Sequence, residues 1–210
     1  MRKFPNRRSI GLSEWAAVMK LAASSMIKGL EPGYNGEIQN RFKNLFLDWF
    51  NKGRGYLEVA GSGTNAIYVG ISALDLPKNS VIHVSPITDP GTVAAIILAG
   101  HRVNVLDTLT EDCGQTSLDS LKNNLTESSS AVVLIHHAGW TADSEGFREF
   151  CDRFNIALFE DFSQSMGART SGRFAGSFGH ISAASTMYRK TLATGGSGGI
   201  IFSDDKEYLA

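Results

Sequence analysis

Residues 60–64, Ala-Gly-Ser-Gly-Thr, link a short apolar run to an amphipathic stretch of the 210-residue chain. Gly63 and Thr64 open a predicted helix, so their backbone amides and the positive helix end suit a phosphate. The stretch also reads G-x-G-x-x-A, one form of the dinucleotide fingerprint. A Rossmann site needs an acid about 20 positions later, whereas Asp89 follows after about 25, in a Pro- and Gly-punctuated loop. A dinucleotide, another phosphorylated cofactor and a structural turn all stay open.

Two later stretches favour a phosphorylated cofactor of another kind. The stretch "IALFEDFSQSMGA" places Asp161 just past the C-terminal end of a buried strand, where α/β sheets bind ligands. The stretch "SAASTMYRKTLATGGSGG" places Lys190 in a loop among small residues. A glycine-opened helix, a strand-end aspartate and a loop lysine supply what pyridoxal phosphate (PLP) needs. These are a phosphate cradle, a partner for the pyridinium nitrogen and a Schiff-base lysine.

The elements that would position these residues alternate along the chain. Predicted helices cover residues 64–75, 91–100, 117–125 and 143–154. Short apolar runs between and after them predict strands at 56–60, 81–85, 102–107, 131–137, 156–161, 180–186 and 198–203. This alternation indicates βαβ units and a mostly parallel, buried sheet, so the predicted fold class is α/β.

Both ends of the chain depart from this alternation. Ser13 is predicted to cap one helix and Gly36 to precede a second, whose apolar positions recur at helical spacing: Ile38, Phe42, Leu45, Phe46 and Phe50. We therefore expect an N-terminal helical segment over 1–52 and a PLP-binding domain over 53–210. The last residues, "SDDKEYLA", begin like a helix capped by Ser203 but stop after about two turns, so we expect more protein to follow.

Composition narrows the classes of protein. The chain is 42% hydrophobic and 20% charged with net charge −1, which gives no general field for nucleic acid or anionic lipid. The basic first ten residues are expected to form a solvated tail, and no apolar stretch is long enough to span a membrane. The two cysteines lack metal-site spacing, and Cys151 lies on the apolar side of a predicted helix. A reduced, cytoplasmic protein is expected.

With these residues in place, the chain resembles the N-terminal and central part of the DegT-type PLP-dependent sugar aminotransferases, of the fold type I class. The similarity runs from about Leu12 to the end. Its landmarks come in family order: "SGTNAIYVGISAL", "AAIILAGHRVNVLD", "VVLIHHAGWTAD", "FEDFSQSMGA", "GRFAGSFGH" and "STMYRKTLATGGSGG". The resemblance implies a three-layer α/β/α large domain, with the family's C-terminal small domain missing from this sequence.

The resemblance also implies the reaction. An amino group would pass from an amino acid, usually glutamate, to a keto group of a nucleotide-linked sugar, at a site in a homodimer interface. No nucleic acid or membrane partner is implied. The rivals are another fold type I reaction, such as dehydration or a lyase step, and a non-catalytic fragment that keeps the fold.

Each residue role implied by the resemblance has a plainer alternative. Lys190 would bind the cofactor covalently and shuttle the proton, or be a surface lysine; the family's dehydratases carry histidine there, so lysine favours aminotransfer. Asp161 would hold the ring nitrogen protonated, or cap the loop after its strand. Gln164 would bond the ring 3-oxygen, or be an ordinary loop amide. Ser185, with Gly63 and Thr64, would bind the phosphate, or merely form a turn.

Some positions depart from the family. The aromatic residue that usually stacks on the ring aligns near Asp89, where the sequence has none; Asp89 is expected to cap the helix that starts at Gly91. His136 and His137 are adjacent at a strand end, so they face opposite ways and do not share a metal. We expect one in the core and one in the cleft. Trp140 could line a sugar or nucleotide site, but we expect it to pack.

Overall fold

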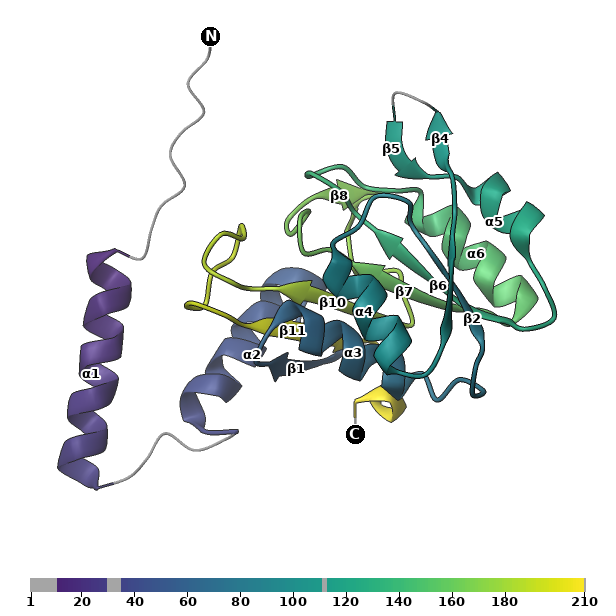
Figure 1. The fold of residues 1–210 in the computed structure, drawn as a ribbon. Helices are drawn as coiled ribbons and strands as arrows, with labels where there is room; N and C mark the ends of the chain where they lie inside the picture. Colours follow the sequence, from purple (N-terminus) through teal and green to yellow (C-terminus); the bar gives the residue numbers. More distant parts are fainter. Residues whose placement is uncertain (1–10, 30–34, 111–112, 210) are drawn as a thin grey trace, which may run out of the picture.

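The computed structural model describes residues 11–29, 35–110 and 113–209, and the basic segment predicted to be a tail, residues 1–10, lies outside them. A central sheet lies between helices on its two faces, and helix α1 (Leu12–Lys28) stands apart from the body (Figure 1). No residue of α1 is buried. Within the described ranges, no helix is long and apolar enough to cross a membrane.

The main sheet has seven strands in the order β1-β11-β10-β7-β6-β2-β3. Only β11 runs against its neighbours β1 and β10, while the other adjacent pairs are parallel. The predicted mostly parallel sheet is therefore confirmed. The strands are β1 (Tyr56–Ala60), β2 (Val81–Val84), β3 (Arg102–Val105), β6 (Ser129–Ile135), β7 (Ala157–Asp161), β10 (Ile181–Ser185) and β11 (Gly199–Ser203).

Helices cover both faces of this sheet. On one face α3 (Gly63–Ala73) and α4 (Pro90–Leu98) bury a core that includes Ile71, Ile96 and Phe159. On the other face, α5 (Leu118–Asn124) and α6 (Ser144–Phe154) pack over β6 and β7, where Cys151 is fully buried as expected. Helix α2 (Glu37–Asn51) covers the β10–β11 end of that face. The predicted three-layer α/β/α arrangement is thus confirmed.

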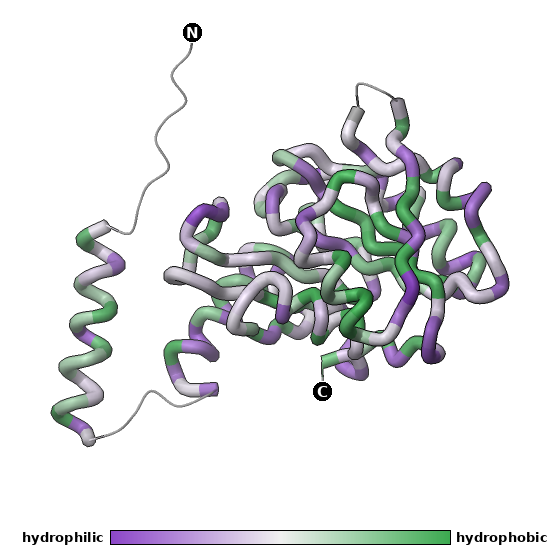
Figure 2. The backbone as a smooth tube through the Cα atoms, in the orientation of Figure 1, coloured by the Kyte–Doolittle hydropathy of each residue, from purple (hydrophilic) through white to green (hydrophobic). Residues whose placement is uncertain are grey.

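An aromatic cluster holds α2 on the sheet. Phe50 stacks on Phe162 with ring centroids 5.4 Å apart and meets Phe202 edge-on at 5.0 Å. Such pairs add to the burial of their rings. Figure 2 shows the hydrophobic colouring concentrated along the sheet strands. Ile38 and Leu45, placed by their spacing on the same stripe of α2, are instead exposed.

Two small hairpins were not predicted from the sequence. They pair β4 (Thr108–Thr110) with β5 (Cys113–Thr116), and β8 (Arg169–Thr170) with β9 (Arg173–Phe174). Their strands have two to four residues, too few for a period-2 pattern to be recognised.

Both predicted serine caps at the ends of the chain were wrong. Ser13 lies inside α1, where the N-cap is Gly11 and the Glu14 carboxylate accepts the Gly11 N–H. Ser203 belongs to β11, and Asp205 caps a single 3₁₀ turn, Lys206–Tyr208, in place of the predicted helix. Ser203 Oγ still accepts the Asp205 N–H at 3.0 Å, but it does so from the end of β11 and not as the cap of a helix.

A buried carboxylate in β7 holds the segment after β6 and the segment before β10. Glu160 in β7 is fully buried and accepts from His136 Nε2 at 2.8 Å and from the Phe178 and Gly179 amides at 2.7 Å. His136 Nδ1 accepts the Ala142 N–H, so the ring proton lies on Nε2. Burial by itself raises the pKa of Glu160, but the hydrogen bonds from His136 and Gly179 hold the pKa below its usual 4.5.

Glu160→Gln should destabilise the fold, because one amide group then faces donors that need an acceptor. We expect a loss of about 2 kcal/mol in the free energy of unfolding at pH 7. A depressed carboxyl pKa contributes stability above the unfolded value that is lost as pH falls through the folded value. Urea unfolding of Glu160→Gln should therefore vary less with pH below 4.5 than the parent chain. The exposed Glu127→Gln is the control, and equal pH profiles for both variants would refute this role.

Candidate active site

A cleft of about 150 Å³ lies at the carboxyl edge of the sheet. Its walls come from the ends of β6, β7 and β10 and from the amino ends of α3 and α4. All the residues predicted for the site line it: Gly63, Thr64, Asp161, Gln164, Ser185 and Lys190. Because all strands but β11 point the same way, residues up to about 130 positions apart converge there.

The amino end of α3 presents free donors to the cleft. Ser62 caps this helix, and its Oγ accepts the Asn65 N–H at 3.1 Å. The first amides of a helix have no intrahelical acceptor. Among the hydrogen bonds of the described residues, those of Gly63 and Thr64 find none elsewhere either. Two N–H groups at the positive end of α3 are therefore suited to bind an anion.

Gly63 is required by the close approach of α3 to β10. A Cβ at this position would lie 2.5 Å from Ser185 Cβ and 3.0 Å from Ser185 Cα. Ser185 is only 8% exposed, and its amide donates to Ser163 Oγ at 2.8 Å. The glycine thus brings the helix amides next to the Ser185 hydroxyl in one wall of the cleft.

Asp161 ends β7 with its side chain on the cleft side and is 5% exposed. Its Oδ1 accepts the Ser163 N–H at 2.9 Å, so the plainer alternative, a cap for the following loop, also describes it. Its Oδ2 accepts from the hydroxyl of the buried Thr92 in α4 at 3.3 Å. Two donors therefore fix the carboxylate while it lines the cleft.

The backbone N–H of Ala138 orients the side-chain amide of Gln164. Its Oε1 accepts the Ala138 N–H at 3.2 Å, and a backbone N–H only donates. The carbonyl side of the amide is therefore directed to Ala138. The Nε2 amino group is left for the cleft that Gln164 lines.

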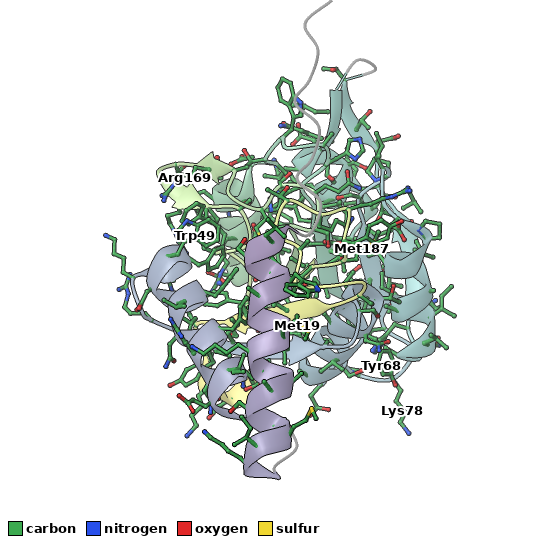
Figure 3. All side chains as sticks on the ribbon, turned by 90° about the vertical axis from the view of Figure 1, so that its left-hand side faces the viewer. Met19, Trp49, Tyr68, Lys78, Arg169 and Met187 are labelled. Carbon is green, nitrogen blue, oxygen red and sulfur yellow. The ribbon has the colours of Figure 1, made fainter. Side chains whose placement is uncertain are left out.

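Lys190 is half-buried in the loop between β10 and β11, and a turn from its N–H to the Met187 carbonyl fixes its backbone. No hydrogen-bond or ion-pair partner of its Nζ occurs among the described residues. Met187, labelled in Figure 3, lines the cleft from the same loop. The lysine amine is therefore available to a ligand in the cleft.

Of the other positions singled out in the sequence near the cleft, some lie where they were predicted to lie and others do not. Asp89 does cap α4, with Oδ1 accepting the Gly91 N–H at 2.9 Å, and it lines the cleft where no aromatic side chain does. His136 is in the core as expected, but His137 is not among the residues that line the cleft. Trp140 is 70% exposed, so its expected packing was wrong.

Thr92 and Ser163 contact the predicted site residues but were missed. A threonine at the start of the helix that follows a parallel strand was the available signal. A larger groove, of about 790 Å³, lies between α1, α2 and the ends of β1 and β11. Its titratable groups among the described residues are Lys28 and Glu37, and none of the residues predicted for the site lines it.

The three-layer fold and this cleft match solved structures of a known class. An aminotransferase from Psychrobacter cryohalolentis superposes with a TM-score of 0.85 at 27% identity, over 97% of this chain and 50% of that chain. An E. coli GDP-4-keto-6-deoxy-D-mannose-3-dehydratase with bound hydrated PLP superposes with a TM-score of 0.83 at 26% identity, over 94% of this chain and 50% of that one. The fold is that of a fold type I PLP-dependent transferase.

The chain belongs to the DegT/DnrJ/EryC1/StrS aminotransferase family, whose profile matches residues 25–210. The match begins later than the Leu12 expected from the motifs. A GDP-perosamine synthase of Vibrio cholerae is 26% identical over 169 residues, which is 80% of this chain and 45% of the relative. The chain thus spans about half the length of the relatives it matches.

Gly63→Ala should damage the fold and the anion site together, because the new Cβ overlaps Ser185. We expect a loss of about 2 kcal/mol in the free energy of unfolding. Binding of inorganic phosphate, measured by calorimetry, should weaken about tenfold. Gly196→Ala is the matched control, since a Cβ there meets nothing within 4 Å. Unchanged phosphate binding in Gly63→Ala would rule out the amino end of α3 as the phosphate site.

Proposed function

We propose that this chain is the cofactor-binding part of a PLP-dependent aminotransferase that acts on nucleotide-linked sugars. The observation that carries the proposal is that one cleft contains a held carboxylate together with two helix amides and a lysine that have no partner among the described residues. The relatives named as nucleotide-sugar enzymes support the substrate class. The cofactor-binding unit is assigned to residues 53–210 and the helical segment to residues 1–52.

The hydrogen-bond donors at one end of the cleft suit the phosphate group of PLP. Gly63 and Thr64 offer two free amides at the positive end of α3, and Ser185 offers a hydroxyl beside them. A phosphate ester needs several hydrogen-bond donors close to its oxygens. Because Gly63 has no side chain, the first turn of α3 lies close to Ser185, so the two amides and the hydroxyl are near one another. These residues are proposed to hold the phosphate.

The ring end fits a pyridine. Asp161 is proposed to accept the ring N–H and so to keep the nitrogen protonated, since an adjacent carboxylate raises such a pKa by roughly 1–3 units. Gln164 is proposed to donate its amino group to the ring oxygen. Ile67 and Ile135 provide apolar surface in the same cleft. Unlike the aromatic residue expected from the resemblance, these side chains are aliphatic.

Lys190 is proposed to bond the cofactor covalently through Nζ and, once displaced by the substrate amine, to move the proton from the amino-acid carbon. PLP, when bound, supplies an electron-withdrawing ring that stabilises negative charge on that carbon.

Aminotransfer is preferred to dehydration because Lys190 stands where, by the resemblance, the family's dehydratases carry histidine. The dehydratase among the similar structures keeps dehydration as the second candidate. The amino donor is proposed to be glutamate. Two further parts complete the proposal. Pairing as a homodimer rests on the family resemblance, and a cytoplasmic location rests on the composition and the cysteines of the sequence.

Borohydride reduction of the chain incubated with PLP should fix the cofactor on Lys190. Lys190 is the lysine that lines the cleft, whereas Lys28 lines the larger groove. Peptide mapping by mass spectrometry checks the site, and Lys190→Arg should abolish the label. A label found on Lys28 or spread over surface lysines would contradict the assignment.

Asp161→Asn should leave PLP bound but slow removal of the α-proton of bound glutamate. Loss of the raised ring pKa predicts a slowing of about 10- to 1000-fold. Hydrogen–deuterium exchange at the glutamate α-carbon, followed by NMR in the PLP-loaded chain, measures this step. Asp119→Asn, on the exposed side of α5, is the control. Normal exchange in Asp161→Asn would mean that another group holds the nitrogen.

A further inference from the structure

The loop over residues 137–142 is tied to the site by one buried serine. Ser165, 3% exposed, donates its hydroxyl toward the His136 carbonyl at 2.9 Å and the Trp140 carbonyl at 3.2 Å. The same oxygen accepts the Gly139 N–H at 3.1 Å. Three backbone groups of residues 136–140 therefore converge on a side chain that follows Gln164 directly.

His136 fixes both ends of the same loop. Its N–H donates to the Asp161 carbonyl at 3.0 Å, and its Nδ1 accepts the Ala142 N–H at 3.2 Å. On the far side, its Nε2 donates to the buried carboxylate of Glu160. The imidazole thus links Glu160 in β7 to Ala142 at the end of the loop.

The loop needs such support because of its backbone. Ala138 and Gly139 have φ values of 52° and 88°, so both lie in the left-handed region. Alanine adopts that region at a steric cost, and surrounding contacts must hold it there. The contacts present are the Gly139 N–H to Ser165 and the Ala138 N–H to Gln164 Oε1.

We propose that Ser165 and His136 are positioning residues that set the orientation of the Gln164 amide. They hold the 137–142 loop so that the Ala138 N–H takes up Gln164 Oε1 and leaves the Nε2 amino group for the cleft. The benefit for the cofactor rests on the proposed function, whereas the orientation itself does not.

The first test reads the orientation directly. The side-chain ¹⁵N–¹H signals of Gln164, assigned by their absence in Gln164→Ala, should be well dispersed in the parent chain. They should move to the values of a free amide in Ser165→Ala. His136→Asn, which approaches the loop from its other end, should give the same change. Ser177→Ala, which removes another buried serine hydroxyl, should leave the Gln164 signals unchanged.

The second test is a double-mutant cycle on the dissociation constant for PLP. We expect Gln164→Ala to weaken binding about tenfold and Ser165→Ala about fivefold, each through one hydrogen bond. Because both act on one contact, the double variant should be no weaker than about tenfold. Ser177→Ala should bind PLP like the parent chain.

The outcomes separate the two proposals. Unchanged Gln164 signals in Ser165→Ala and His136→Asn, or effects that multiply in the double variant, overturn the positioning role. A parent chain that does not bind PLP overturns the proposed function. In that case the NMR signals still decide the positioning role, since a shifted Gln164 amide supports it and an unshifted one does not.

Discussion

Two adjacent buried carboxylates at the end of β7 are the constraint on which the cleft depends. Glu160 and Asp161 point to opposite faces of the sheet, as neighbours on a strand must. Burying a carboxylate costs free energy unless hydrogen-bond donors surround it. Each of the two carboxylates has its own group of donors. Glu160 gathers His136 and two loop amides, and Asp161 gathers Thr92 and the Ser163 amide. The segment after β6, the segment before β10 and the amino end of α4 are consequently tied to one strand.

The regular part of the fold could be predicted because it repeats. Short apolar runs alternating with helical patterns gave the parallel sheet, and the glycine turn gave the start of α3. The β4–β5 hairpin and the exposed Trp140 could not be found this way, since they depend on which loops meet after the sheet has formed. The serine caps failed for a local reason: a strand and an earlier glycine took those positions.

The site was predictable to the extent that its residues lie at ends of elements. Asp161 follows a strand, Gly63 opens a helix and Lys190 occupies a glycine-rich loop, so each carries a local signal. Thr92 does lie at a helix start, but nothing local pairs it with Asp161, because their contact spans 69 positions in the chain. The same holds for Ser165, whose partners lie 25 to 29 positions away. Side chains that orient other side chains emerge only when the strands are placed together.

The central claim is that one cleft holds both ends of PLP, and a crystal structure of the chain grown with the cofactor tests it most directly. The account predicts the phosphate on the amides of Gly63 and Thr64, with the ring nitrogen toward Asp161 and the carbonyl carbon at Lys190. Cofactor density in the larger groove between α1 and α2, or a phosphate away from α3, would contradict it.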